Sequence, residues 1–206
     1  DSFSIAKYPV TNAQYDVFIH HPDGYNNPKW WDYSDEAKKW RAGRSEMEKP
    51  YFDAGDCPRE MVSWYDSVAF CLWLSAMTDE KIMLPTEQQW QRAAIGDTNR
   101  IYPWGDTIDD SYLNYAENIG RTTPITQYPK GASPYGVMDM AGNVWEWCLT
   151  DHETGNNDLS GAEVRVLRGG SWHDSGEGWF RASFRDRVTP TSKYNNWGLR
   201  IACARL

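Results

Sequence analysis

The sequence predicts an α+β fold with short strands and many irregular connections. Helix starts lie in the first half of the chain, whereas short extended pieces separated by turns dominate after Gly96. Helices followed by small strands are the pattern of α+β proteins. Sixteen Gly and eleven Pro favour a loop-rich fold over a helical bundle. Because 206 residues suffice for one compact domain with a sizeable core, we expect a single domain over residues 1–206.

Three helix starts are marked by capping patterns. Thr11-Asn-Ala-Gln14 is a capping box, and the helix after it places Tyr15, Phe18 and Ile19 on one face. Ser63 opens a second helix, which is almost wholly apolar through Leu74 and must therefore be buried. The third follows Leu84-Pro-Thr86-Glu-Gln-Gln89 and stops at Gly96.

Residues 22–58 form a long insert rich in Trp, Asp, Asn and Gly. We expect a short helix near residues 35–41, and Trp30, Trp31 and Trp40 should anchor the insert to the body. Strands are expected at 144–148, 164–167 and 199–203, where apolar and polar residues alternate. The first of these places Trp145 and Trp147 on one face.

The charge is acidic overall and basic toward the end. The formal net charge of −8 argues against a nucleic-acid partner. From Ala162 onward, however, eight Lys and Arg stand against four Asp and Glu. We expect four of these arginines to be structural, paired with carboxylates and carbonyls of the acidic body: Arg168, Arg181, Arg185 and Arg200.

The four cysteines lie far apart and show no metal-ligand spacing. Cys71 and Cys148 sit in apolar runs, where a free thiol behaves as a small hydrophobe. Reduced thiols and a cytoplasmic location are therefore expected, with disulfides as the alternative. No apolar run approaches the ~18 residues of a membrane span, and no secretory signal is present. The abrupt start at Phe3-Ser-Ile5 suggests a module of a larger multidomain protein.

Seven phrases, in order along nearly the whole chain, resemble the formylglycine-generating enzyme (sulfatase-modifying factor) family. They are Tyr8-Pro-Val-Thr-Asn12, Val62-Ser-Trp-Tyr65, Leu84-Pro-Thr-Glu87, Tyr102-Pro-Trp-Gly105, Asp139-Met-Ala-Gly-Asn-Val-Trp-Glu-Trp147, Arg168-Gly-Gly-Ser-Trp172 and Gly198-Leu-Arg200. The resemblance implies a C-type-lectin-like fold with two small twisted antiparallel sheets, packed helices and many irregular loops.

The resemblance also implies a structural calcium site at Asp139, Gly142, Val144 and Glu146. Two carboxylates with carbonyls between them suit Ca²⁺, which takes six to eight oxygen ligands. The alternative is that the two carboxylates pair with arginines of the tail. A second family calcium site is matched only by Asn118 and Ile119, and the short loop at 120–123 leaves it incomplete.

The catalytic residues of the family's copper oxidases are not found at the matching positions. Two cysteines after the Gly-Gly-Ser-aromatic phrase hold copper in those enzymes; here the positions are Asp174 and about Trp179. The related iron-dependent sulfoxide synthases draw histidines from a further helical domain, which these residues do not include. His20, His21, His152 and His173 show no ligand spacing. We therefore expect no enzyme; the alternative is an oxidase or sulfoxide synthase using non-standard residues.

The tail is most similar to variable proteins of diversity-generating retroelements, in which adenine-specific mutagenesis rewrites a C-terminal ligand-binding face. Their scaffold resembles Arg168-Gly-Gly-Ser-Trp172, Arg181, Arg185, Pro190 and Gly198-Leu-Arg200, with Lys193 where Arg is commoner. Adenine changes in an Asn codon can yield most of the intervening residues, although not Glu177 or Trp179. A relative whose loops have drifted, or a degenerate domain that only mediates assembly, remains the alternative.

We accordingly expect residues 162–206 to form a variable region that binds a protein or other macromolecule. Trp179, Phe184 and Tyr194 are the candidate aromatic anchors, and adaptable polar groups should surround them. Trp172 and Trp197 are assigned to the core. The full predicted ligand-binding set is His173, Asp174, Ser175, Glu177, Trp179, Phe184, Asp186, Arg187, Val188, Ser192, Tyr194, Asn195 and Asn196.

Overall fold

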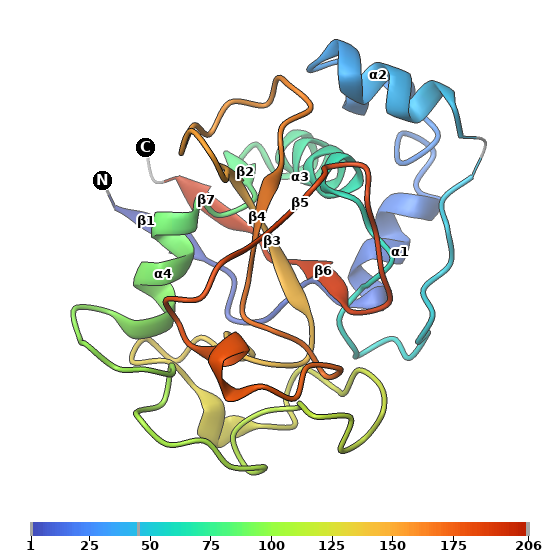
Figure 1. The fold of residues 1–206 in the computed structure, drawn as a ribbon. Coiled ribbons are helices and arrows are strands. Elements are labelled where there is room, and N and C mark those ends of the chain that lie inside the picture. The colour runs from blue at the N-terminus through green and yellow to red at the C-terminus, as the bar shows by residue number, and fades with distance from the viewer. Residues whose placement is uncertain (1, 45, 205–206) are drawn as a thin grey trace.

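The computed structural model describes residues 2–44 and 46–204 and has α+β architecture (Figure 1). Four α-helices pack around two small sheets, and the lower part of the molecule in Figure 1 consists mostly of loops. In chain order the elements are β1 (Phe3–Ile5), α1 (Asn12–His20), η1 (Pro28–Trp31), α2 (Asp35–Ala42), α3 (Trp64–Thr78), β2 (Ile82–Met83), α4 (Glu87–Ile95), η2 (Pro129–Gly131), β3 (Trp145–Asp151), β4 (Arg165–Arg168), η3 (Glu177–Phe180), β5 (Asp186–Val188), β6 (Trp197–Leu199) and β7 (Ala202–Ala204).

The first sheet is three-stranded and antiparallel, in the order β1-β7-β2. The second is four-stranded, in the order β5-β4-β3-β6. In this sheet β6 runs parallel to β3, with Trp197 opposite Trp145, whereas the other pairs are antiparallel. The expectation of two small antiparallel sheets is therefore wrong for this one pair. The loop after β5 brings the chain back along the far side of β3, in the same direction as β3.

The single strand predicted at 199–203 is divided between the two sheets. β6 ends at Leu199 and β7 begins at Ala202, so the chain crosses from one sheet to the other at Arg200 and Ile201. The alternation of residue types continues through the crossing, which explains why the sequence suggested one strand. The crossing places Arg200 between the two sheets.

The predicted capping boxes are confirmed. The Thr11 hydroxyl accepts from the Gln14 amide at 3.3 Å, and Gln14 Oε1 accepts from the Thr11 amide at 3.0 Å. Equivalent reciprocal pairs open α3 and α4. α4 ends where Gly96 takes a φ of 64°, a left-handed value that glycine adopts without strain. The predicted short helix is α2.

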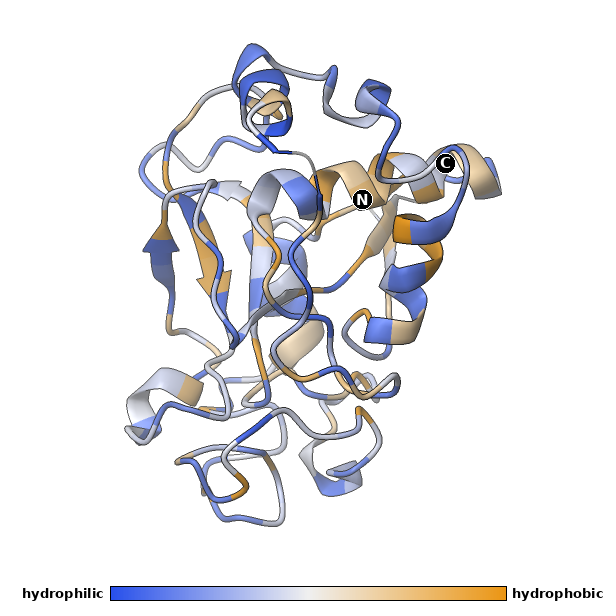
Figure 2. Ribbon diagram, turned by 90° about the vertical axis from the view of Figure 1, so that its right-hand side faces the viewer, coloured by the Kyte–Doolittle hydropathy of each residue, from blue (hydrophilic) through white to orange (hydrophobic). Residues whose placement is uncertain are grey.

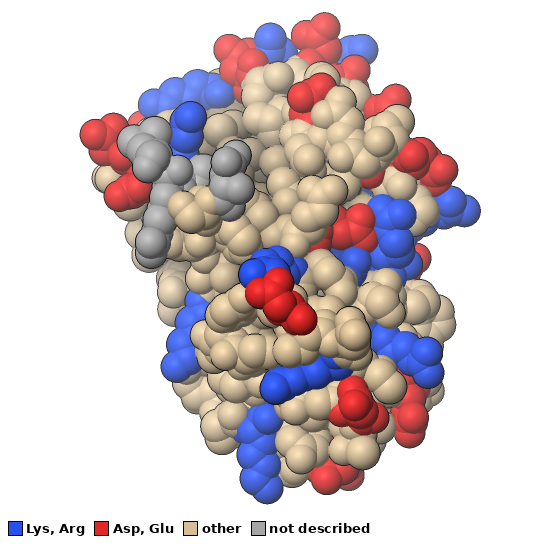
Figure 3. Space-filling view, turned by 90° about the vertical axis from the view of Figure 1, so that its left-hand side faces the viewer, with Lys and Arg blue, Asp and Glu red and all other residues tan. Residues whose placement is uncertain are grey.

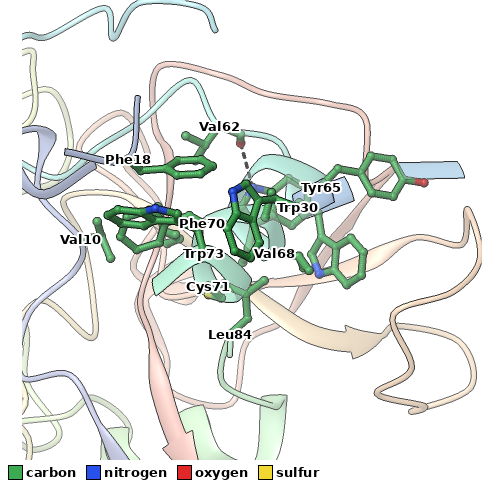
Figure 4. Close-up of a cluster of buried hydrophobic side chains, with 14 of the residues drawn as sticks. Val10, Phe18, Trp30, Val62, Tyr65, Val68, Phe70, Cys71, Trp73 and Leu84 are labelled. Atoms are coloured by element: carbon green, nitrogen blue, oxygen red, sulfur yellow. Dashed lines mark hydrogen bonds between the residues drawn. The ribbon is translucent and has the colours of Figure 1, made fainter. Parts of the chain in front are cut away.

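The two faces of the four-stranded sheet bury different clusters. Trp145, Trp147 and Leu167 face the largest one, which is built around the buried side chains of α3 (Figure 4). The indole of Trp147 is completely buried and donates to the Val62 carbonyl at 3.0 Å. The other face packs against α4, chiefly through Trp90. Side chains of successive strand residues point to opposite faces, so β3 serves both clusters.

The insert is fixed to the large cluster by its tryptophans, as predicted. Trp30, Trp31 and Trp40 are all buried, and η1 and α2 lie over the α3 side of the core. Hydrophilic and hydrophobic residues both occur along the helices in Figure 2, whereas the loops are mainly hydrophilic or intermediate. Within the described residues, no helix is long and apolar enough to span a bilayer.

Candidate functional site

The predicted binding residues lie at the surface of the loops and short elements between Ser171 and Trp197. None of the thirteen is buried. Exposed side chains are those of His173, Ser175, Glu177, Trp179, Arg187 and Tyr194. Half-buried ones are those of Asp174, Phe184, Asp186, Val188, Ser192, Asn195 and Asn196. We call this surface the C-terminal face.

One aromatic centre of the C-terminal face is formed by Trp179 and Phe184. Their ring centroids are 4.8 Å apart, and both rings contact Trp145 of β3, at 6.3 and 6.0 Å. Trp179 is 40% exposed, while the adjacent Phe180 is fully buried and anchors η3. The short 3₁₀ turn therefore presents Trp179 outward from a fixed base. Trp145, a contact residue of this centre, was not predicted as part of the site.

A second aromatic centre is formed by Tyr194, which is 60% exposed and lies 4.8 Å from the ring of Trp197. Trp197 meets Trp147 edge to face at 5.7 Å. Trp172 is buried as expected, but Trp197 is only half-buried, so its assignment to the core was only partly correct. Trp197 stands on an edge strand, where one side of its ring is uncovered.

The loop that carries Tyr194 is held by the start of α3 and the segment before it. The Met61 amide donates to the Tyr194 carbonyl at 3.1 Å, and the Trp64 amide donates to the Pro190 carbonyl at 3.1 Å. The fixed contacts are made by the backbone, so the Tyr194 side chain can differ without loss of either bond.

Asp174 belongs to the frame of the face. Its Oδ2 accepts hydrogen bonds from the Ser171 amide at 2.9 Å, the Ser171 hydroxyl at 2.6 Å and Trp145 Nε1 at 2.9 Å. Asn196 donates to the same hydroxyl through Nδ2, at 2.9 Å. Ser171 and Trp145 are buried, so these bonds satisfy donors that water does not reach easily. Asp174, at the first family cysteine position, thus ties β3 to the start of the tail.

A loop that was not predicted supports the same turn. The amides of Ala116 and Glu117 donate to the carbonyls of Asp174 and Trp172, at 2.7 and 2.8 Å. Both donors have a φ of 55°, and no residue type in the sequence signals this conformation. Glu117 also lies 2.8 Å from His173 Nδ1, but both side chains are more than half exposed, so the pair contributes little.

The three residues of β5 point to two different sides. Asp186 and Val188 are half-buried, and Val188 packs against the large cluster. Arg187 is exposed on the opposite side, where it pairs with Glu153 at 2.8 Å. The structure therefore does not bring Arg187 together with Trp179 and Tyr194. The period of two along a strand could have indicated this separation.

Three of the four tail arginines are structural, as predicted. Arg168 and Arg185 both pair with Glu87, at 2.6 and 2.7 Å, and Arg168 also donates to the Ala182 carbonyl. Arg181 is exposed and makes no ion pair within the described residues. Acidic and basic side chains are interspersed on the face shown in Figure 3, with no continuous basic area.

Arg200 is the third structural arginine, and it pairs with a carboxylate of the predicted calcium site. Its guanidinium lies 2.7 Å from Glu146 Oε1, and both groups are buried. Trp90 Nε1 donates to Glu146 Oε2 at 2.7 Å. Arg200 also donates to the carbonyls of Ala6 and Met138, at 2.8 and 2.6 Å. This residue therefore joins the two sheets at the crossing between β6 and β7.

These contacts do not fit calcium at Glu146, because a guanidinium already balances its charge and both oxygens have donors. Asp139 accepts from Asn143 Nδ2 at 3.1 Å, and burial raises its pKa to about 7. Gly142 and Asn143 take positive φ values of 78° and 66°, which form the turn between Asp139 and β3. Pairing with a tail arginine, the alternative to calcium, is thus present for Glu146.

Cys57, Cys71 and Cys148 are buried free thiols. In the described part of the chain, no three His, Cys, Asp or Glu side chains are placed so as to hold a metal ion. Trp179, at about the second family cysteine position, is exposed and meets Phe184 and Trp145 edge to face in the first aromatic centre.

The sequence reasoning also missed an aromatic contribution from the insert. Tyr51 is 71% exposed, and its neighbour Phe52 meets Trp172 edge to face at 5.5 Å. Asn12 Nδ2 donates to the Phe52 carbonyl at 2.8 Å, and Glu60 Oε1 accepts from the Phe52 amide at 2.7 Å. The 22–58 insert thus borders the start of the tail. An exposed aromatic in a long loop is too common to be recognised as a site residue from sequence.

Comparisons with known proteins place these features in a family. Residues 1–205 match the sulfatase-modifying factor enzyme 1-like domain. Hercynine oxygenase of Mycobacterium tuberculosis is 30% identical over 232 residues, which cover 98% of this chain and 52% of the oxygenase. Inactive C-alpha-formylglycine-generating enzyme 2 of Bos taurus is 32% identical over 195 residues, 84% of this chain and 58% of that protein. The chain spans about half the length of these relatives.

Solved structures show the same fold. Treponema denticola variable protein 1 superposes with a TM-score of 0.71 at 24% identity, covering 98% of this chain and 84% of its own. PvdO from Pseudomonas aeruginosa superposes with a TM-score of 0.75 at 20% identity, covering 98% and 80%. The fold is the C-type-lectin-like architecture expected from the seven phrases. The chain belongs to the sulfatase-modifying factor (formylglycine-generating enzyme) family.

Proposed function

We propose that this chain is a non-enzymatic binding module whose C-terminal face recognises a protein or other macromolecule through interchangeable side chains. The observation that carries the proposal is that different groups of the tail hold its shape and face the solvent. Backbone contacts and buried polar groups hold its loops, while the side chains of His173, Ser175, Glu177, Trp179 and Tyr194 project into solvent. A surface of this kind can change its contacts without changing its shape.

The chemistry of the face suits macromolecular recognition. Two exposed aromatic anchors, Trp179 and Tyr194, stand among hydroxyl, amide and carboxylate groups. Rigid aromatic anchors with adaptable polar neighbours are the pattern of paratopes and of interface hot spots. The anchors rest on Trp145 and Trp197, so their positions are fixed before a ligand arrives.

The family's copper chemistry is not supported at this face. Asp174 and Trp179 occupy the positions expected for thiolates, and Asp174 is already engaged by Ser171 and Trp145. The family includes a member named as inactive, which agrees with a fold that persists without catalysis. A role of this chain as a variable protein is compatible with its fold, because Treponema denticola variable protein 1 has the same fold.

The structure alters the set of residues proposed to vary. Asp174 and Asn196 stabilise the buried Ser171 turn through their side chains, so we assign both to the frame. Diversification should be concentrated at exposed positions instead. Sequencing the flanking locus tests this proposal: it should contain an adenine-rich second copy of the tail's coding sequence beside a reverse transcriptase gene. A locus with neither would remove the diversification claim.

A second candidate function is an oxygenase or oxidase that uses non-standard ligands. It is favoured by the 30% identity to hercynine oxygenase across 98% of this chain. This candidate predicts stoichiometric iron or copper bound near His173 and Asp174. Metal analysis of the full-length protein purified without chelators distinguishes this enzyme from the binding module. Stoichiometric iron or copper would favour the enzyme, since the binding module requires no such metal.

A further inference from the structure

A surface hollow in the insert, remote in sequence from the C-terminal face, has an unusual charge. It has a volume of about 570 Å³ and lies between η1, α2 and the segment after α2. Five charged side chains line it, and four are cationic: Lys29, Lys38, Arg41 and Arg44, against Asp32. The local excess of three positive charges contrasts with the net charge of −8 for the whole chain. We call it the insert hollow.

The two arginines are not neutralised by carboxylates. Within the described residues, neither Arg41 nor Arg44 has an Asp or Glu oxygen within ion-pair distance. Arg41 uses its guanidinium on carbonyls instead, donating to those of Arg44 and Tyr25. Arg44 lies over the ring of Trp40, 3.1 Å from its centroid. Both cations therefore keep their charge available to a ligand.

Arg41 is also held in place before any ligand binds. Its guanidinium carbon lies 4.8 Å from the ring centroid of Tyr25 and 5.3 Å from that of Trp31. A stacked guanidinium is planar, permanently charged and suited to oxyanions. Among the described residues, neither Arg41 Nε nor the Nε1 of the fully buried Trp31 has a hydrogen-bond partner, and both atoms are buried.

The two lysines can join such a site at small cost. Lys29 pairs with Asp23 at 2.7 Å and Lys38 with Asp32 at 2.9 Å, and both lysines are about half exposed. Exposed ion pairs of this kind are weak, so an incoming dianion can share or replace the carboxylate. The size of the hollow lies in the range of about 300–1,000 Å³ typical of small-molecule sites, which is larger than an inorganic anion alone requires.

We propose that the insert hollow binds a small molecule through a phosphate-type dianionic group, held by Arg41 and Arg44 with Lys29 and Lys38 at the rim. The rest of the molecule would lie against Pro28 and Ala42, which contribute apolar surface to the lining. This site is separate from the C-terminal face and does not depend on the function proposed for that face.

Calorimetric titration of the protein with inorganic phosphate tests the proposal. Parallel titrations with sodium chloride at matched ionic strength give the reference, and titrations with acetate test a monoanion. We expect saturable binding of one phosphate, at least about tenfold weaker binding of acetate, and none of chloride. Sulfate binding equal to that of phosphate supports a dianion site as well. No saturable phosphate binding up to about 10 mM would overturn the proposal.

Charge-matched variants locate the binding. Arg44→Gln should weaken phosphate binding about tenfold. Arg92→Gln is the control, because it removes one positive charge from α4, where Arg92 pairs with Asp97. Arg41→Gln is expected to lose phosphate binding as well. If this variant fails to fold, phosphate binding is measured with Arg41→Lys in its place. Equal loss in Arg44→Gln and Arg92→Gln would show only a general charge effect and would refute the site.

Discussion

Replacing Asp174 by Ala is expected to destabilise the domain strongly, although the residue lies in a surface loop. The change removes the acceptor of three hydrogen bonds, from the Ser171 amide, the Ser171 hydroxyl and Trp145 Nε1. Ser171 is 0% exposed and Trp145 3%, so the amide and the indole N–H are left without partners in a largely dry environment.

The magnitude follows from those two orphaned donors. Each buried donor without a partner costs about 1–3 kcal/mol. Asp174 itself is half-buried, and water entering its place will recover part of the loss. We therefore expect Asp174→Ala to lower the free energy of unfolding by about 2–4 kcal/mol. Asp174→Asn keeps an oxygen acceptor but loses its charge, so it should cost less.

Equilibrium urea unfolding, followed by tryptophan fluorescence, measures the effect. The control is His173→Ala at the adjacent residue, whose side chain is 59% exposed and should change stability by less than about 0.5 kcal/mol. If the two variants were equally stable, Asp174 would not be part of the frame. The same outcome would reopen position 174 as a variable ligand contact.

Three further predictions concern buried charged groups. Arg200→Met leaves the buried Glu146 carboxylate without its cation, so the free energy of unfolding measured in urea should fall by about 3–5 kcal/mol. A near-wild-type free energy of unfolding would contradict the role of this pair in the frame. Burial raises the pKa of Glu60 to about 7 in the folded protein, so the free energy of unfolding should fall by on the order of 3 kcal/mol as the pH rises from about 4.5 to 7. Glu60→Gln should flatten this fall, and an unchanged pH profile in that variant would exclude Glu60 as its cause. Because the Arg200 guanidinium already binds the Glu146 carboxylate, the melting temperature of the protein should be the same in calcium and in a chelator. A rise in melting temperature with calcium that is lost in Asp139→Asn would instead establish the predicted calcium site.

Local signals in the sequence predicted the helices well. Each capping box depends on residues three positions apart, so Thr11, Ser63 and Thr86 identified the starts of α1, α3 and α4 without information from the rest of the fold. The burial of Trp30, Trp31 and Trp40 was predictable for the same kind of reason. Large apolar rings in a polar insert must find a core.

Features that depend on pairing between distant segments could not be predicted in this way. The parallel alignment of β6 with β3 and the crossing at Arg200 depend on the path of the loop between β5 and β6. The role of Asp174 depends on Trp145, which is 29 residues away in sequence. The sequence pattern could not separate the frame residues Asp174 and Asn196 from the exposed residues of the C-terminal face.

Two libraries displayed on cells and challenged with protease test the central claim most directly. In one, the exposed residues His173, Ser175, Glu177 and Tyr194 are randomised together. In the other, the buried or half-buried residues Ser171, Asp174 and Arg200 are randomised together. Our account predicts that most members of the first library resist protease as the wild type does, whereas most of the second are cleaved. Comparable cleavage of both libraries would show that the exposed residues are needed for folding and would contradict an exchangeable face on a fixed frame.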